Sequence, residues 1–282
     1  MTSPSQSSPR DRIVATALAE ITAKGLSVGL DHISLEKVIA ASGVSRATAY
    51  RIWSNKQQFL ADVIVEAVRT TTLEVDTELE VGRLRALLER TPDFATNPAS
   101  RRHVVVDGLR ISIRADLDRI VTSPKWATYL ALSATCRGLP DGILRTEVTA
   151  ALAEADRRFT AHRVSVYARI PRLLGYRLVP PLEERNGFEL LSQAAGALMT
   201  GFVVKAGTQP ELLTTGFRLA AFEAGELEWT VPSFALTGLV LSYLEPDPGI
   251  PWGPEQTERF RATLAEIAGV LETAWGEQDG PA

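Results

Sequence analysis

Residues 33–63 read ISLEKVIAASGVSRATAYRIWSNKQQFLADV and decide how the N-terminal part of the chain folds. Apolar residues recur at helical spacing at the start of this stretch, until Gly43 ends the pattern. Ser45 is a good N-cap for a second helix, which has little of its own to bury. That helix carries the polar residues Arg46, Thr48, Tyr50 and Arg51. The stretch predicts a helix, a four-residue turn and a helix, an arrangement that places the second helix in a DNA major groove about 12 Å wide.

Size and composition are those of a soluble globular protein with a sizeable core. The chain has 282 residues, enough for one large domain or two smaller ones, and 45% of them are hydrophobic. The net charge is −4, but residues 1–69 hold eight Lys/Arg against six Asp/Glu, or +2, which leaves 22 bases and 28 acids, or −6, for the remainder. The sign of this asymmetry weakly favours a polyanionic partner at the N-terminal end.

The sequence offers no metal centre and no disulfide. Cys136 is the sole cysteine, so we expect a small buried apolar residue there. His32 and His103 have no companions at ligand spacing, and we expect no cofactor and no metal effector. The longest nearly uncharged apolar stretch, residues 231–244, is broken by a proline and a glycine and is shorter than the roughly 20 residues that a membrane span needs. We therefore expect a cytoplasmic protein without a membrane partner.

Helical periodicity continues along most of the chain, and no convincing period-two strand pattern interrupts it. The first 12 residues have no apolar core and are no signal peptide. The fold class predicted is all-α: an N-terminal three-helix bundle with a helix-turn-helix, then a larger helical domain. Helices are expected over residues 13–21, 34–42, 45–52, 83–90, 99–121, 124–136 and 144–173, and a further helix that begins at Ser54 is expected to continue past Arg69 as a connector. The predicted domains are a tail (1–9), a DNA-binding domain (10–69), an effector-binding and dimerisation domain (70–276) and a second tail (277–282).

Two late segments combine an apolar stripe with helical spacing. Residues 188–202 place small side chains beside the stripe, and residues 260–275 form a second one. Small residues let two helices approach closely, either inside the chain or between two subunits, and the pattern leaves both alternatives open.

The text SLEKVIAASGVSRATAYRIWSNKQQFL resembles the DNA-binding domain of the TetR family of bacterial transcriptional regulators. The shared elements are a hydroxyl residue, a Gly-Val-Ser turn, a Thr-x-Tyr triplet, an aromatic residue, an Asn-Lys pair and a leucine, all in register. The resemblance covers under a quarter of the chain. It implies that a DNA-binding head is followed by helices that form a homodimer and hold a cavity for a small-molecule effector.

The residues of the motif suit contacts with DNA. Arg46 is the best candidate for a bidentate contact with guanine, Ala47 for a thymine methyl group, and Arg51 for a base or a phosphate. Hydroxyl and amine groups suit the phosphates. The DNA-binding candidates are Ser34, Ser45, Arg46, Ala47, Thr48, Tyr50, Arg51 and Lys56.

Four positions depart from the family pattern. Trp53 stands where the family usually has phenylalanine and is expected in the core. Ile39 and Ser42 replace small alanines of the family, and a bulkier Ile39 would shift the recognition helix. Ile52 stands where relatives often carry a histidine, so one phosphate contact is expected to be missing. These departures affect the docking on DNA more than the fold.

Polar and aromatic residues on the middle helices are the candidates for an effector pocket. They are Arg110, Trp126, Tyr129, Phe159, His162 and Tyr167. The chain exceeds the roughly 200 residues usual for the family, and the surplus is expected in residues 207–254, as a lid on the cavity or as an extension of the dimer interface.

The function expected is a ligand-responsive DNA-binding regulator, a repressor released from a palindromic operator by a small molecule. An activator with the same head is the alternative, because sequence does not give the sign of regulation. An enzyme is the least favoured class, because no phosphate-binding glycine loop, nucleophile elbow, zinc motif or paired-carboxylate motif is found and no catalytic residue is assigned. A purely architectural DNA binder would not need so large an acidic body.

Overall fold

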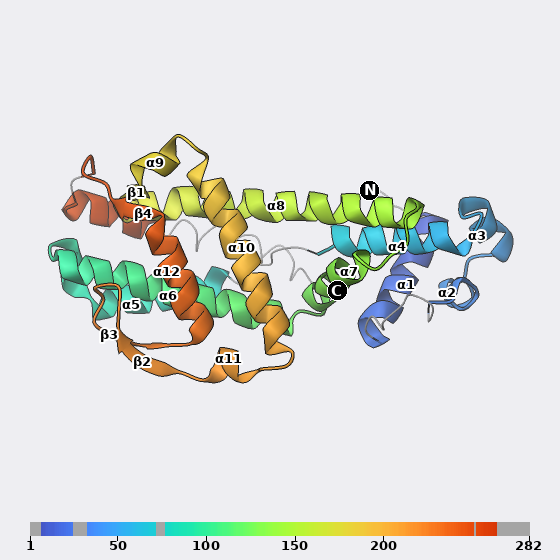
Figure 1. The fold of residues 1–282 in the computed structure, drawn as a ribbon, viewed down its shortest axis with the longest axis horizontal. Coiled ribbons are helices and arrows are strands. Elements are labelled where there is room, and N and C mark those ends of the chain that lie inside the picture. Colours follow the sequence, from blue (N-terminus) through green and yellow to red (C-terminus); the bar gives the residue numbers. More distant parts are fainter. Residues whose placement is uncertain (1–6, 25–32, 72–76, 251, 264–282) are drawn as a thin grey trace, which may run out of the picture. The chain divides into compact units, whose positions relative to one another are not determined.

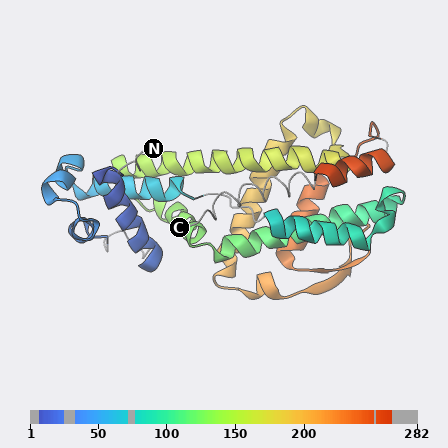
Figure 2. The ribbon, with the colours of Figure 1, turned by 180° about the vertical axis from the view of Figure 1, so that it is seen from behind.

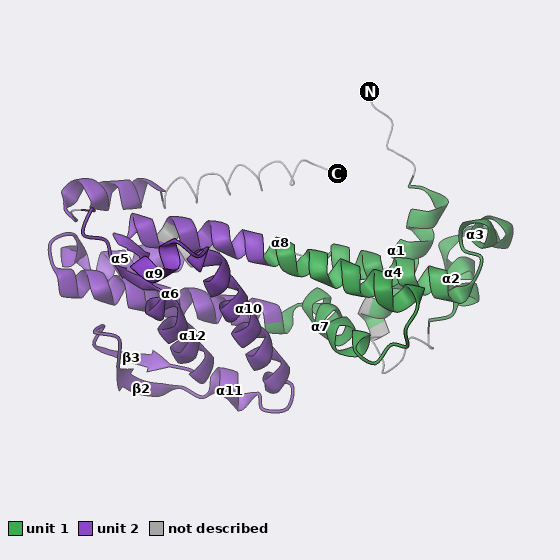
Figure 3. Cartoon of the chain, turned by 45° about the horizontal axis from the view of Figure 1, so that its top comes forward, with its two compact units in different colours: residues 1–73, 121–159 green, residues 74–120, 160–282 purple. Residues whose placement is uncertain are grey.

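The computed structural model describes residues 7–24, 33–71, 77–250 and 252–263. The described chain is mainly helical, as predicted, with two small β-sheets (Figure 1). Most of the predicted N-terminal tail, His32 and the C-terminal tail lie outside the described residues, as does most of the stripe over 260–275. The chain divides into two compact units (Figure 3): Met1–Leu73 with Val121–Phe159, and Glu74–Ile120 with Thr160–Ala282.

Unit 1 is a group of helices arranged around α1. The helix α1 contacts α2, α3, α4 and α7, and α4 also contacts α7. Its apolar residues Ile13 and Ala17 are fully buried. The unit consists of α1 (Pro9–Lys24), α2 (Leu35–Ser42), α3 (Arg46–Ile52), α4 (Lys56–Arg69), α7 (Pro124–Cys136) and the first part of α8 (Ile143–Leu173). Residues 121–159 thus fold together with the N-terminal helices, whereas the sequence indicates only a change of role near residue 70 and no strong boundary. The helix α4 ends at Arg69 and does not continue past it as predicted.

The middle helices of unit 1 meet in an aromatic cluster. The ring centroids of Trp126 and Phe159 are 5.0 Å apart, and Tyr129 lies edge-on to both at 5.3 and 5.5 Å. Cys136 is buried at the other end of α7, with its Sγ 3.2 Å from the Thr149 hydroxyl. The cysteine is therefore a small buried residue of α7, as expected.

Unit 2 is a helical assembly with two antiparallel strand pairs. The helices α5 and α6 lie side by side (Figure 2) and share a core of Leu87, Leu88 and Val104. The elements are α5 (Thr77–Arg90), η2 (Pro92–Ala95), α6 (Pro98–Thr122), the rest of α8, β1 (Tyr176–Leu178), α9 (Pro180–Glu183), α10 (Gly187–Ala206), α11 (Glu211–Thr214), β2 (Phe217–Ala220), β3 (Glu226–Trp229), α12 (Val231–Ser242) and β4 (Leu244–Pro246). Residues 254–263 are helical as well.

The four strands were not expected from the sequence. β1 pairs with β4, and β2 pairs with β3, which brings Phe217 opposite Trp229. Each strand has only three or four residues, and every residue of β2 is exposed, so no alternation of apolar and polar residues can develop. Periodicity fails here because the strands are too short to show it.

The β2–β3 hairpin lies in the predicted insertion, and three side chains of α6 hold its backbone. Arg102 Nε donates to the Phe222 carbonyl at 2.9 Å, and Arg110 Nη1 donates to the Glu228 carbonyl at 3.0 Å. His103 Nδ1 lies 2.6 Å from the Ala224 carbonyl. The carbonyl of Phe222 is placed there by a left-handed backbone with a φ of 55°. The hairpin is therefore a fixed part of unit 2.

Among the described residues, one helix is long and apolar enough to cross a membrane, the 20-residue α10 with a mean hydropathy of 1.3. A single helix of this kind is weak evidence, because core helices of soluble proteins pass the same test. One face of α10 is packed inside the unit, where Leu191 is fully buried and α12 lies against it. Leu190 and Val204 remain 41% and 60% exposed. The apolar stripe of α10 therefore packs inside the chain, and these two exposed residues lie outside that stripe.

Two glycines of α10 have opposite surroundings. A Cβ added at Gly187 would lie 2.8 Å from both the Cβ and the carbonyl oxygen of Leu182, whereas nothing lies within 4 Å of one at Gly201. We predict that Gly187→Ala destabilises the protein by about 1–3 kcal/mol, because the Leu182 backbone must move. Gly201→Ala should stabilise it by up to about 1 kcal/mol through helix propensity. Urea unfolding followed by circular dichroism measures both, and equal effects would contradict the packing at Gly187.

Candidate DNA-binding surface

The helix-turn-helix is formed by α2, the turn at Gly43 and α3, and each helix begins at a hydroxyl cap. The side chain of Ser34 accepts the Lys37 N–H at 3.4 Å, and that of Ser45 accepts the Thr48 N–H at 3.1 Å. Gly43 has a φ of 68°, the left-handed conformation that ends α2. These groups satisfy backbone donors that would otherwise be unpaired and fix where the recognition helix starts.

The inner side of the motif is apolar. Val44 and Ala49 are buried, and Trp53 is only 2% exposed, edge-on to Phe59 at 5.3 Å. Trp53 is therefore a core residue, as expected. Ile39 is buried as well, so its larger side chain belongs to the packing of α2. Ser42 donates its hydroxyl to the Ile39 carbonyl at 2.9 Å, a bond that an alanine could not make.

The end of the recognition helix is anchored through one carboxylate. Asp62 Oδ2 of α4 accepts from Trp53 Nε1 at 2.8 Å and from Arg10 Nε at 3.0 Å. Trp53 is the C-cap of α3, and Arg10 lies in the first turn of α1. The bond to Asp62 is the largest contribution to the raised pKa of Arg10. Asp62 thus connects three segments of the motif at one point.

The outer side of α3 is polar and exposed. Arg46, Ala47, Tyr50 and Arg51 are exposed, and Thr48 is half-buried with its hydroxyl 2.8 Å from that of Ser45. Lys56 is exposed at the start of α4, next to the N-cap Asn55. The eight residues predicted for DNA contact thus lie on the helix-turn-helix and the first turn of α4. Their contacts with DNA remain a proposal.

Sequence reasoning missed Glu36, which lies among these candidates. Its Oε2 accepts from the Ser34 hydroxyl at 3.0 Å, and its Oε1 accepts from the Tyr50 hydroxyl at 3.2 Å. A backbone hydrogen bond of Glu36 lowers its pKa, and the bonds from Ser34 and Tyr50 lower it further. The side chain is therefore a carboxylate at neutral pH. The Glu36 carboxylate accepts hydrogen bonds from two of the hydroxyl groups that are predicted to bind phosphate.

The six residues predicted for an effector pocket are divided between the two units. Trp126, Tyr129 and Phe159 form the aromatic cluster of unit 1. In unit 2, His162 is exposed, and burial, together with the negative charge of Asp116, raises the pKa of Tyr167 to about 12.

Arg110 has a structural partner besides the hairpin. Its Nε lies 2.6 Å from Oδ1 of the buried Asp107. Its guanidinium thus connects α6 to β3 and serves the packing of unit 2. A sequence pattern cannot separate this use from ligand binding.

A cavity of about 510 Å³ in unit 1 is lined by charged residues of both signs. Asp62 and Glu154 lie in its wall together with several arginines, and Arg157 is paired with Glu154. Within the part of the chain that the structure describes, no cluster of His, Cys, Asp and Glu could hold a metal ion.

No family model and no curated protein matches the chain. Among solved structures, it is similar to the reduced form of E. coli NemR, with 13% identity over 85% of this chain and 98% of that one and a TM-score of 0.44. It is also similar to NalD, described as the secondary repressor of the MexAB-OprM multidrug efflux pump in Pseudomonas aeruginosa, with 20% identity over 73% of this chain and 89% of that one and a TM-score of 0.38. Both TM-scores are low, so neither likeness supports a conclusion about what this chain binds.

We predict that Glu36→Gln strengthens binding to every DNA duplex and makes the salt dependence steeper by about one unit of log K against log salt. The amide oxygen can still accept from one of the two hydroxyls, and the amide NH₂ can donate to the other, but the negative charge beside the proposed phosphate contacts is gone. Fluorescence anisotropy at several salt concentrations measures both quantities. Glu147→Gln is the matched control, because it removes one exposed acid of unit 1 outside the helix-turn-helix. Equal effects of the two variants would contradict a position of Glu36 at the DNA.

Proposed function

We propose that the protein is a DNA-binding transcriptional regulator that uses α3 as its recognition helix. The observation that carries this proposal is the geometry of α3. It is capped at both ends and held from behind by Trp53, and it buries Ala49 while exposing Arg46 and Arg51. A short helix with this distribution contributes little to the core, so its exposed residues suit the edges of bases and the phosphates of a major groove.

The proposed contacts divide into two kinds. Arg46, in the first turn of α3, is assigned to a guanine edge, and Ala47 to a thymine methyl group. The phosphate contacts are assigned to the side chains around them, since such contacts position a protein without reading sequence. These are Ser34, Ser45, Thr48, Tyr50 and Lys56, with Arg51 reaching either a base or a phosphate.

We further propose that two copies act together on a palindromic operator. One head touches few base edges, whereas two heads about one helical turn apart roughly multiply their specificities. Unit 2 is then the dimerisation and effector part. A small molecule that binds it would release the operator, which makes the protein a repressor.

The proposed function is tested with duplex DNA from the region upstream of the protein's own coding sequence. We expect a mobility shift of this duplex. The affinity of the protein for DNA should fall by roughly a thousandfold or more between about 50 and 200 mM salt, because phosphate contacts release counterions. A scrambled duplex of the same length is the control. Absence of binding to either duplex at low salt would overturn the proposal.

The assigned roles predict two different single-residue phenotypes. Arg46→Ala should cost about 1–3 kcal/mol and relax the base preference at one operator position. Lys56→Ala should weaken binding to all DNA sequences alike. It should also reduce the slope of log K against log salt by about one unit. Competition with a panel of operator variants separates the two, and identical effects of the substitutions would contradict these roles.

A further inference from the structure

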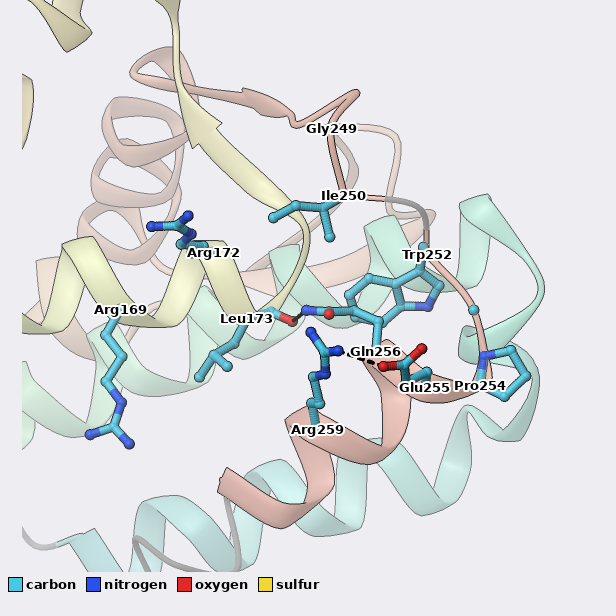
Figure 4. Close-up of a pocket in the computed structure, with 11 residues that line it drawn as sticks. Arg169, Arg172, Leu173, Gly249, Ile250, Trp252, Pro254, Glu255, Gln256 and Arg259 are labelled. Atoms are coloured by element: carbon cyan, nitrogen blue, oxygen red, sulfur yellow. Dashed lines mark hydrogen bonds and ion pairs between the residues drawn. The ribbon is translucent and has the colours of Figure 1, made fainter.

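Unit 2 contains a second cavity, of about 770 Å³, at the C-terminal end of α8 (Figure 4). Three segments line it: the last turns of α8, the loop after β4 and the start of the helix over residues 254–263. Its volume lies in the range of sites for small organic molecules. None of the residues proposed for DNA binding takes part in it, and neither do the six residues predicted for an effector pocket.

Backbone and side-chain hydrogen bonds hold these segments together. The Asp247 N–H donates to the Gly175 carbonyl at 2.8 Å, and Gln256 Nε2 donates to the Leu173 carbonyl at 2.9 Å. The Asp247 side chain closes the loop by accepting the Gly249 N–H at 2.8 Å. The loop is therefore held against the end of α8 by hydrogen bonds and forms one wall of the cavity.

One wall of the cavity is apolar. Leu173 and Trp252 pack against the core of Leu87, Phe94 and Phe260. The indole of Trp252 and the side chain of Ile250 lie next to each other in Figure 4. Trp252 Nε1 is buried and has no hydrogen-bond partner among the described residues. This wall offers a flat ring and aliphatic surface to an apolar group.

The other residues of the cavity carry an excess of positive charge. Arg169, Arg172 and Arg259 line it, against the single acid Glu255, which pairs with Arg259 at 2.5 Å. Among the described residues, Arg169 and Arg172 have neither an ion pair nor a hydrogen bond of their side chains. In Figure 4 the two guanidinium groups point away from Trp252, so both must turn to reach one ligand. Both side chains are long and exposed, and they can turn without leaving a partner.

A fourth guanidinium, outside the lining of the cavity, lies over the ring of Trp252. The Arg101 guanidinium lies 5.0 Å from the centre of the Trp252 ring. Burial lowers its pKa, and no carboxylate of the described residues pairs with it. Solvated arginines at a helix C-terminus are common, because they interact favourably with the helix dipole. That explanation covers Arg169 and Arg172 but not Arg101 on the indole.

We propose that this cavity binds an organic anion, with its carboxylate or phosphate group on Arg169 and Arg172 and its apolar body against Trp252 and Ile250. Guanidinium groups bind both kinds of anion through paired N–H donors. A neutral ligand of the same shape would leave the positive charge uncompensated. A free inorganic anion would leave the apolar wall exposed to water. The site therefore selects molecules that carry both features.

Isothermal titration calorimetry on the full chain tests the site with two anionic probes, 1-naphthoate and 1-naphthyl phosphate, and with neutral 1-naphthamide. We expect at least one anion to bind with one site per chain. The amide should bind with an affinity at least roughly tenfold lower. The stronger of the two anions shows whether the site prefers a carboxylate or a phosphate. Binding of neither anion at millimolar concentration, or equal binding of the amide, would overturn the proposal.

Arg172→Ala should lower the affinity for the anion by roughly tenfold or more, because one charge-assisted contact is lost. Arg172→Lys should recover part of the affinity, since the charge remains without the planar fork. Arg185→Ala, at another exposed arginine of unit 2, is the matched control and should leave affinity unchanged. Unchanged affinity of Arg172→Ala, with the fold verified by circular dichroism, would remove Arg172 from the site and overturn the assignment.

A role of this cavity as the effector site rests on the proposed function and is tested separately. The bound anion should release DNA from the wild-type protein at concentrations that leave Arg172→Ala on the DNA. DNA binding that is unaffected by a saturating anion would overturn the effector role. If the protein binds no DNA at all, the proposed function fails, while the calorimetry still decides whether the anion site exists.

Discussion

The helix α3 depends on a carboxylate that it does not contain. Asp62 accepts hydrogen bonds from Trp53 and from Arg10, and so fixes the end of α3 against both α1 and α4. A seven-residue helix is too short to be stable alone and buries little of its own surface. Its orientation must come from its neighbours. The T-shaped contact of Trp53 with Phe59 gives the apolar part of this support, and Asp62 gives the polar part.

The helices could be predicted from the sequence, because their periodic patterns are long. The ends of α7 were predicted at Pro124 and Cys136, as observed, and those of α8 within one residue. The strands could not be predicted, since β1 to β4 have three or four residues and pair across the chain. The same reason hides Glu36: its contact with Tyr50 spans 14 residues and depends on the angle between α2 and α3. Sequence spacing identifies the members of a helix face but not the angle at which two helices meet.

Charge also has to be considered locally and not as a total. The net charge of −4 gives no hint of nucleic acid, and the N-terminal +2 is a weak signal. In the folded head, Arg46 and Arg51 are exposed on one short helix, and Glu36 opposes them from α2. Under the proposed function, Glu36 beside the phosphate contacts lowers the affinity for all DNA alike, so base contacts must supply more of the binding free energy. A regulator gains specificity from that balance, because non-specific binding rests almost entirely on phosphates.

The helix α8 contributes residues to both compact units. Its first part carries Phe159 in the aromatic cluster of unit 1, and its last turns carry Arg169 and Arg172 at the cavity proposed to bind an organic anion. A shared helix is not by itself a coupling between ligand binding and DNA binding: a ligand shifts an equilibrium only if it binds two states with different affinity. The end of α8 next to this cavity is irregular, because Pro171 removes one backbone donor from the helix and Gly175 turns the chain with a φ of 75°.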